Sequence, residues 1–215
     1  MPRLIDLSHP IGHGQRPYPG DPAVRIESWA TIARDGFNVS RIEMGSHHGT
    51  HIDAPRHFFQ EGDAVDQIEL TRLCGPAMLV DLAPGGSLPP GAVITPQMVQ
   101  EHRQAFGRGA RVVYRTGWDR RYGEESYYTD YPSMDVSAAR WIAAQGIALL
   151  GMDTPGPAAE DPEVHRVLLR HDARIVLVES LCGLERLPAC FTLMAFPLKL
   201  AGLDGAPARV VAQVG

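Results

Sequence analysis

The sequence predicts a mixed α/β fold, of the α/β or α+β kind, built around one mixed sheet with short edges. The last third of the chain alternates strand, helix and strand, which favours a parallel βαβ unit. The first third carries short alternating segments joined by turns, which favours antiparallel pairing. The 215 residues show no internal repeat and no polar linker, so a single domain over residues 1–215 is expected.

The strands expected in the first half share short apolar or β-branched runs bounded by turn residues. They are residues 3–7, 24–33, 38–44 and 77–82. The second and third are separated by the turn sequence at 34–36, which predicts a hairpin. Before this hairpin, the proline-rich stretch 17–22 predicts a rigid, extended loop that presents Tyr18.

The second half is expected to alternate helices with strands. Thr95 and Asp161 are each followed by a proline, which is typical of a helix start, and Gly146 is typical of a helix end. The expected helices are therefore 95–104, 136–145 and a third that opens at 161 and runs to 172. Apolar runs predict strands at 111–115, 147–152 and 174–179.

The composition argues against nucleic-acid and membrane partners. The chain has 20 Lys and Arg against 25 Asp and Glu, a net charge of −5, with no basic cluster that could follow a phosphate backbone. No apolar run approaches the ~18 residues of a membrane span, and no signal-peptide pattern opens the chain, so a cytoplasmic protein is expected. The three cysteines form no C-x-x-C pair, which argues against a disulfide framework or a zinc ribbon.

The stretch HHGTHIDAPRH at residues 47–57 holds four of the nine histidines. Gly49 and Pro55 argue against a helix here, whereas Thr50 and Ile52 favour an extended backbone. In an extended segment, side chains two residues apart share a face. The residues that would share one face of this segment are His47, His51, Asp53 and His57.

This same-face set predicts a metal site. Imidazole and carboxylate ligands without thiolate fit Zn²⁺ first, and also Mn²⁺ or Fe²⁺. Several imidazoles buried beside a carboxylate would be hard to satisfy without an ion. A lone histidine, by contrast, is more often a hydrogen-bonded structural residue. That structural role is the expectation for His9, His13, His48 and His102.

Two residues from the last third are candidates to complete the site. His165 lies on the helix that opens at Asp161, and Glu179 follows four apolar residues at the end of a strand. A carboxylate at that position would sit at the rim of the sheet and need a partner. Taken alone, either residue is better explained as an exposed surface group.

The segment 47–57 matches every fixed position of H-x-G-T-H-x-D-x-P-x-H, and with it the chain resembles the metal-dependent cyclase family of hydrolases. That family includes bacterial kynurenine formamidase (arylformamidase) and isatin hydrolase. The resemblance extends over most of the chain, through Asp6-Leu7-Ser8, Tyr18-Pro19-Gly20-Asp21, Thr116-Gly117-Trp118, Gly151-Met152-Asp153-Thr154, His165 and Glu179. It implies a compact single-domain β/β/α swivelling-type fold with a mixed sheet, and a homodimer.

The resemblance also implies roles for the site residues. His47, His51 and Asp53 would bind one divalent ion, and Asp53, His165 and Glu179 a second, with Glu179 also reaching the first. Zn²⁺ is the expected metal and Mn²⁺ the alternative. His57 would be the catalytic acid/base. Tyr18 would line the substrate pocket at a position where the bacterial kynurenine formamidases carry Trp, which leaves the identity of the substrate open.

The expected function is metal-dependent hydrolysis of a C–N bond other than a peptide bond, in a small-molecule amide. A metal-activated hydroxide would attack the carbonyl carbon, and His57 would transfer the proton to the leaving nitrogen. The first candidate is an arylformamidase-like reaction in tryptophan catabolism, which converts N-formylkynurenine to kynurenine and formate. The alternative within the family is hydrolysis of a cyclic amide, as in isatin hydrolase.

Two other classes of function use some of the same residues. His51, Asp53 and His165 match the two-histidine, one-carboxylate triad of a mononuclear Fe²⁺ oxygenase, but this leaves the other three site residues without a role. A non-catalytic metal-binding protein would use a closed structural site, and such sites usually hold zinc with four ligands that include cysteine. Consumption of oxygen would identify the first class, and an open, water-accessible coordination position would argue against the second.

Overall fold

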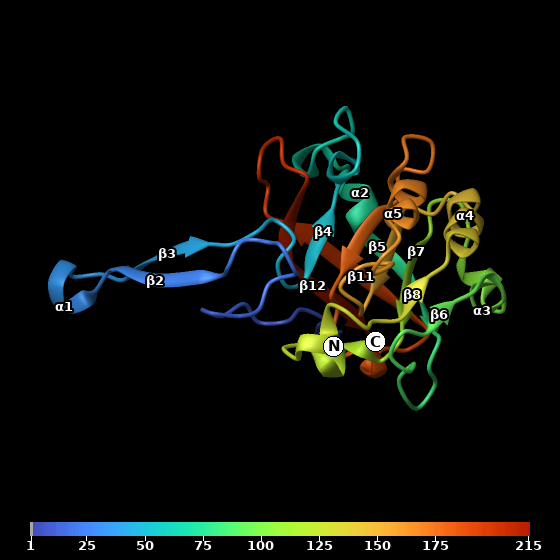
Figure 1. Cartoon of the computed structure of the whole chain (residues 1–215), viewed down its shortest axis with the longest axis horizontal. Helices are drawn as coiled ribbons and strands as arrows, with labels where there is room; N and C mark the ends of the chain where they lie inside the picture. The colour runs from blue at the N-terminus through green and yellow to red at the C-terminus, as the bar shows by residue number, and fades with distance from the viewer. Residues whose placement is uncertain (1) are drawn as a thin grey trace.

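A mixed sheet that closes on itself lies at the centre of the molecule (Figure 1). The computed structural model describes residues 2–215. In this part of the chain the sheet has eight strands: β1 (Arg3–Asp6), β4 (His51–Asp53), β5 (Cys74–Asp81), β7 (Arg111–Arg115), β9 (Leu149–Met152), β10 (Val176–Glu179), β11 (Cys190–Pro197) and β12 (Gly205–Val214). Their order is β1-β12-β11-β5-β7-β9-β10-β4, and β12 also pairs with β4, which makes the sheet barrel-like.

Strand direction divides the sheet into a parallel part and an antiparallel part. The four central strands, in the order β5-β7-β9-β10, run parallel to one another. The pairs that involve β1, β4, β11 or β12 are all antiparallel. The parallel strands β9 and β10 are joined through a helix, which is the βαβ unit expected in the last third. The prediction of a mixed α/β fold is therefore confirmed.

Helices cover one face of the parallel strands, on the right of Figure 1. They are α3 (Pro96–Gln100), α4 (Val136–Ala144) and α5 (Pro162–Leu169), and a shorter helix, α2 (Leu70–Leu73), leads into β5. Asp135 and Asp161 cap α4 and α5, since their side chains accept hydrogen bonds from the backbone N–H of Ala138 and Glu163. These caps fix where the two helices begin.

Successive side chains of the parallel strands point to opposite faces of the sheet, so these strands contribute to two apolar cores. Leu150 and Val112 point toward the helices, whereas their neighbours Leu149 and Val113 point into the interior of the closed sheet. Each fully buried side chain of this size stabilises the fold by about 1.5–3 kcal/mol. Both faces of these strands are therefore buried, and the strands hold the site that lies at their ends.

The sequence predicted neither β11 nor β12, and the strand predicted at 24–33 ends at Ala30, where the short helix α1 follows. The other differences lie at the ends of helices. The helix predicted at 95–104 ends at Gln100, and a separate 3₁₀ turn follows at Arg103–Ala105. The helix predicted to reach 172 ends at Leu169, because Arg170 has a non-helical ψ of 151°. Local sequence signals fixed the starts of these helices but not their ends.

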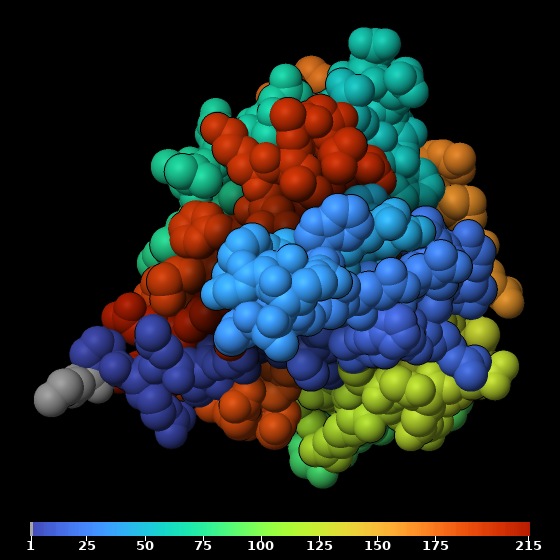
Figure 2. Space-filling view, turned by 90° about the vertical axis from the view of Figure 1, so that its left-hand side faces the viewer, coloured from blue at the N-terminus to red at the C-terminus, as the bar shows by residue number. Residues whose placement is uncertain are grey.

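A hairpin arm projects from the body of the molecule (Figure 1). It consists of β2 (Arg25–Ala30), the short helix α1 (Ile32–Asp35) and β3 (Val39–Glu43). Figure 2, which faces the arm, shows it rising toward the viewer over the N-terminal segment. Its apolar residues are largely exposed, with Trp29 at 66%, Phe37 at 58% and Ile42 at 59%. Grouped apolar exposure of this kind indicates an interaction surface.

The remaining elements are short. A two-stranded parallel pair joins β6 (Val93–Ile94) to β8 (Ser133–Met134). The other 3₁₀ turns are Pro55–His57, Val65–Gln67, Trp118–Arg121, Glu125–Tyr127 and Leu184–Arg186. None of the helices formed by residues 2–215 has the length and apolar character needed to cross a membrane.

Candidate metal centre

Strand pairing brings the two distant parts of the candidate site together. β4 lies between β10 and β12, and its register sets His51 opposite Glu179. The same strand sets Asp53 opposite Gly205 at the start of β12. The apolar run of β10 is buried and ends at Glu179, so this carboxylate emerges directly beside the histidine-rich segment.

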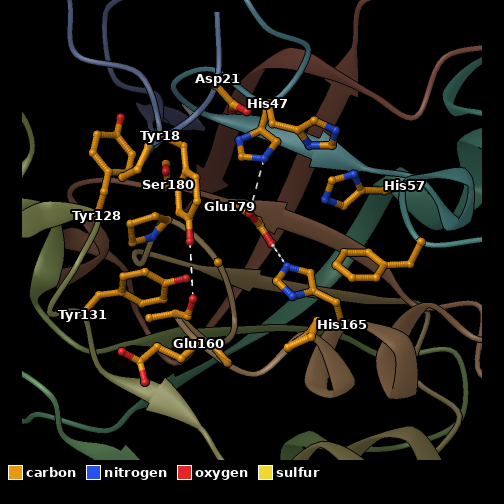
Figure 3. Close-up of a pocket in the computed structure, with 18 of the residues that line it drawn as sticks. Tyr18, Asp21, His47, His57, Tyr128, Tyr131, Glu160, His165, Glu179 and Ser180 are labelled. Atoms are coloured by element: carbon orange, nitrogen blue, oxygen red, sulfur yellow. Dashed lines mark hydrogen bonds and ion pairs between the residues drawn. The ribbon is translucent and has the colours of Figure 1, made fainter.

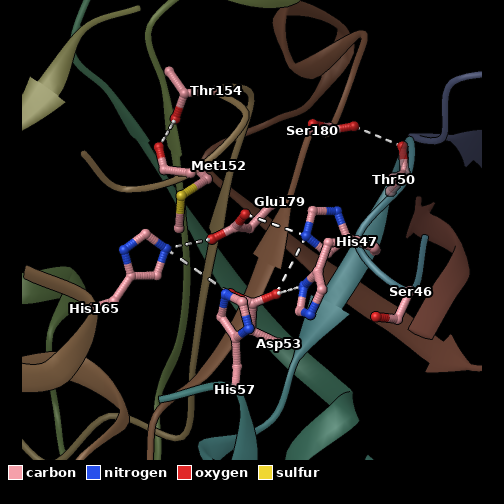
Figure 4. A network of polar contacts seen from close by, with 12 residues as sticks. Ser46, His47, Thr50, Asp53, His57, Met152, Thr154, His165, Glu179 and Ser180 are labelled. Atoms are coloured by element: carbon pink, nitrogen blue, oxygen red, sulfur yellow. Dashed lines mark hydrogen bonds and ion pairs between the residues drawn. The ribbon is translucent and has the colours of Figure 1, made fainter. Parts of the chain in front are cut away.

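His51, Asp53 and Glu179 form the buried centre of the cluster. Figure 4 shows Asp53 and Glu179 there, with His47, His57 and His165 around them. His51 Nε2 lies 3.2 Å from Asp53 Oδ1 and 3.3 Å from Glu179 Oε2, and all three side chains are at most 4% exposed. His51 Nδ1 lies 2.9 Å from the carbonyl oxygen of Gly49 and donates to it, which turns Nε2 toward the carboxylates. A histidine fixed in this way is typical of a metal ligand.

His47 reaches Asp53 from the loop that precedes β4. Its Nδ1 lies 2.7 Å from Asp53 Oδ1, and its Nε2 lies 2.6 Å from Asp204 Oδ2. Gly49, with a φ of 66°, makes the bend that turns the chain between His47 and the strand. Asp204 was not anticipated from the sequence, since it is 157 positions from His47 and no motif marks it.

His165 approaches the same carboxylates from α5. Its Nε2 lies 3.6 Å from Glu179 Oε1 and 4.0 Å from Asp53 Oδ2, and its ring stacks on Phe58 with centroids 4.8 Å apart. Each carboxylate therefore turns one oxygen toward His51 and the other toward His165. This is the arrangement that two neighbouring cations bridged by carboxylates would need.

The donor set fits divalent cations on a further observation. Asp53 Oδ2 and Glu179 Oε1, the two oxygens that face His165, are buried and find no hydrogen-bond partner among residues 2–215. A buried, unpaired carboxylate oxygen is costly unless a cation or a donor satisfies it. The nitrogen and oxygen ligands without sulfur match Zn²⁺ or Mn²⁺.

Ion pairs within the cluster raise the pKa of two histidines and lower that of Asp53. Burial alone would lower the pKa of His47, but attraction to Asp53 and hydrogen bonds with Asp204 and Asp53 raise it to about 11. Burial opposes the charged form of His51 as well, yet Asp53 and Glu179 raise its pKa to about 9. Burial also disfavours the ionised form of Asp53, but His47 and His51 hold its pKa well below the usual value. His47 and His51 therefore hold protons in the metal-free site, and a bound cation would replace those protons beside the same carboxylates.

His57 lies at the edge of the cluster, at the end of the 3₁₀ turn that begins at Pro55. Its side chain is 31% exposed, and its Nε2 lies 4.0 Å from Asp53 Oδ2. Burial lowers its pKa, and attraction to Asp53 only partly offsets this, so the imidazole is neutral at pH 7. Ligand atoms of His47, Asp53 and His57 also lie within 4.8 Å of one another, so the geometry allows His57 to act as a proton carrier or as a ligand.

A cavity of about 340 Å³ opens onto this cluster (Figure 3). Tyr18, Tyr128 and Tyr131 form one wall, and His57 and His165 lie opposite. Tyr18 donates from its hydroxyl to the carbonyl oxygen of Ala159 at 3.4 Å, and its ring meets Tyr128 edge-on at 5.8 Å. The loop that the sequence predicted to present Tyr18 therefore places it in the wall of the cavity.

Two residues of the segments that carry the family resemblance lie outside the cluster. Trp118 is 1% exposed and donates from its indole N–H to Tyr127, as a core residue does. Asp153 accepts hydrogen bonds from the backbone N–H of Thr116 and Gly117, so it closes a loop rather than orienting a ligand. Of the histidines expected to be structural, His13 accepts from a backbone N–H and His9 stacks on Tyr122.

Comparison with known proteins finds matches over nearly the whole chain. The family model described as "Putative cyclase" matches residues 5–159. The kynurenine formamidase of Bordetella petrii is 30% identical over 216 residues, which cover 98% of this chain and 98% of the relative.

Two solved structures share the fold. One is described as a potential metal-dependent hydrolase with cyclase activity; it has 27% identity and a TM-score of 0.81 over 99% of this chain and 98% of its own. The other is an isatin hydrolase bound to the product analogue thioisatinate, with 25% identity and a TM-score of 0.86 over 99% of this chain and 92% of its own.

Proposed function

The chain belongs to the Cyclase family, and from this membership and the buried cluster we propose that it is a metal-dependent hydrolase of the arylformamidase kind. It hydrolyses a C–N bond other than a peptide bond, in the amide of an N-formyl aryl amine. N-formylkynurenine, cleaved to kynurenine and formate, is the first substrate to test, and the cyclic amide of isatin is the second. The single observation that supports the metal chemistry is the pair of buried carboxylate oxygens left unpaired beside His165.

We propose that the cluster holds two divalent ions. His47, His51 and Asp53 hold one, and Asp53, His165 and Glu179 hold the other, with Glu179 also reaching the first. The support is that both carboxylates present oxygens to both sets of histidines. Zn²⁺ is the first choice and Mn²⁺ the second, because the ligands are nitrogen and oxygen only.

A divalent ion in such a site lowers the pKa of a coordinated water toward ~7 and polarises a carbonyl oxygen. The neutral imidazole of His57 accepts a proton from the attacking water and delivers it to the amide nitrogen. The new C–O bond and the broken C–N bond then give a carboxylic acid and a neutral amine. Proton transfer by a positioned histidine is typically worth ~10²–10⁴ in rate. Tyr18 and the tyrosines beside it pack against the aryl ring of the substrate.

The experiment is hydrolysis by the purified protein after reconstitution with Zn²⁺ and, separately, with Mn²⁺. We expect turnover of N-formylkynurenine, and weaker or no turnover of isatin, with no uptake of oxygen. Failure on both substrates would overturn the proposed substrate class. Oxygen consumption dependent on Fe²⁺ would instead favour the oxygenase, although that triad leaves three of the gathered side chains unused.

We also propose that the protein is a homodimer joined through the hairpin arm. Its cytoplasmic location stays a prediction. A twofold interface uses the same patch on both copies, which suits a projecting arm with exposed Trp29, Ile32, Phe37 and Ile42. Sedimentation of the wild type is expected at twice the chain mass of 23.4 kDa.

The double change Trp29→Ser and Phe37→Ser removes the two large aromatic side chains of the arm and is expected to shift the protein to monomer. Analytical ultracentrifugation at micromolar concentration measures this. Leu70→Ser is the control, because Leu70 is equally exposed, at 67%, and lies on α2, away from the arm. A dimer that survives the double change would contradict the role given to the arm.

A further inference from the structure

We propose that Asp204 is a positioning residue for the metal centre, which holds His47 in the orientation and tautomer that a metal ligand needs. The proposal rests on the proposed function in assuming a metal at this cluster, but not on any particular substrate. None of the motifs in the sequence pointed to this residue. It lies in the loop that leads into β12, far from the histidine-rich segment in the sequence.

The geometry divides the two nitrogens of His47 between two carboxylates. Nδ1 points to Asp53 Oδ1 at 2.7 Å, toward the buried centre, and Nε2 points to Asp204 Oδ2 at 2.6 Å, toward the outside. A neutral imidazole that offers the lone pair of one nitrogen to a cation carries its proton on the other. When an ion replaces the proton on Nδ1, Asp204 accepts the N–H that remains on the outer nitrogen. Partners of this kind orient metal-binding histidines and increase their basicity.

Asp204 is itself held in place at three points. Ser46 donates from its hydroxyl to Asp204 Oδ2 at 3.1 Å, and the backbone N–H of Ala54 donates to the Asp204 carbonyl oxygen at 2.9 Å. The next residue, Gly205, pairs with Asp53 in the sheet. The carboxylate is therefore tied to the segments on both sides of the candidate ligands.

Gly205 shows how closely this backbone approaches His47. A Cβ at this position would lie 2.7 Å from His47 Cε1 and 2.6 Å from the carbonyl oxygen of Ile52. Only a glycine lets the chain pass between the imidazole and β4 at that distance. The loop thus supports His47 through its backbone at Gly205 and through the side chain of Asp204.

A simpler role for Asp204 would be to anchor the loop before β12, and the chain offers a matched control for that. Asp66 Oδ1 accepts from the backbone N–H of Gly202 at 2.9 Å, so Asp66 anchors the same loop. No hydrogen bond or ion pair joins Asp66 to His47 within the described structure. Loss of either aspartate loosens the loop, but only loss of Asp204 frees the outer nitrogen of His47.

The experiment measures Zn²⁺ affinity by competition with a chromophoric chelator for the wild type, Asp204→Ala, Asp204→Asn and Asp66→Ala. Asp204→Ala is expected to weaken affinity by ~10–100-fold. Asp204→Asn is expected to recover most of it, because an amide oxygen accepts the same hydrogen bond. Asp66→Ala is expected to stay within about twofold of the wild type. The absorption spectrum of the Co²⁺-loaded protein is a second readout, since it changes with the ligand geometry.

Unchanged Zn²⁺ affinity in Asp204→Ala would overturn the proposal, as would an equal loss in Asp66→Ala. Thermal unfolding of the metal-free variants shows whether each one is folded, so a loss of structure is distinguished from a loss of positioning. The measurement uses Zn²⁺ alone, with no substrate. Failure to hydrolyse N-formylkynurenine would therefore count against the proposed function and leave this result unaffected.

Discussion

Replacing Asp53 with alanine is expected to remove bound metal and to lower kcat/KM by at least ~10³-fold, which corresponds to about 4 kcal/mol of transition-state stabilisation. Asp53 is 1% exposed, and its two oxygens lie within 4.0 Å of four histidines. Glu179 also reaches His51 and His165, but Asp53 is the carboxylate that in addition contacts His47 and His57. Its loss breaks both proposed sites at once and leaves His47 and His51 without their main counter-charge.

Metal content per chain, measured by plasma mass spectrometry after dialysis against Zn²⁺, checks this result alongside the kinetics. Asp63→Ala is the matched control, since Asp63 is a half-exposed carboxylate ten residues along the chain, paired loosely with Arg174 at 4.0 Å. The control is expected to keep its metal and its rate. Retention of two ions in Asp53→Ala would contradict the role of Asp53 as the bridging ligand.

The sequence predicted the architecture where the signal was local. Runs of apolar residues marked the parallel strands, Asp161 marked the start of α5 and Gly146 the end of α4, because these signals depend on residues that are neighbours in the chain. The barrel-like closure was not visible, since it depends on pairing of β12 with β4 across about 150 positions. A hydrophobic pattern shows which residues are buried but not which strand lies beside which.

The expectation that alternate residues of 47–57 share one face of an extended segment was correct for only part of the segment. Only 51–53 are in the strand, so His51 and Asp53 share a face for the reason given. His47 reaches the cluster through the bend at Gly49, and His57 through the 3₁₀ turn that begins at Pro55. The structure brings these residues together with His165 and Glu179, whereas their roles as ligands stay predictions.

Asp204 shows what a single sequence lacks. A lone aspartate before a glycine carries no chemical signature, and its partner His47 is 157 positions away. The signal that could have marked it is structural: Gly205 must pass so close to the imidazole that no larger residue fits. Residues that orient a ligand are selected by the geometry of the fold rather than by a local pattern.

His57→Ala is expected to keep its metal and to lose ~10²–10⁴ in kcat. The imidazole is partly exposed to the cavity, and burial keeps it neutral, so it can accept a proton from water and return it to the leaving nitrogen. Its Nε2 lies 4.0 Å from Asp53, as that of His165 does, but His165 also lies 3.6 Å from Glu179, and no such ion pair joins His57 to Glu179 within residues 2–215. The contact with one buried carboxylate rather than two, together with the greater exposure of His57, favours a proton carrier over a metal ligand.

The metal content of His57→Ala, compared with that of Asp53→Ala, decides between the two roles. Partial recovery of kcat on addition of free imidazole is expected if the missing group only transfers protons. If instead metal content falls as far as in Asp53→Ala, His57 is a ligand, as its place within 4.8 Å of His47 and Asp53 allows. The leaving nitrogen would then have to take its proton from solvent, and the catalytic assignment made from the sequence would be wrong.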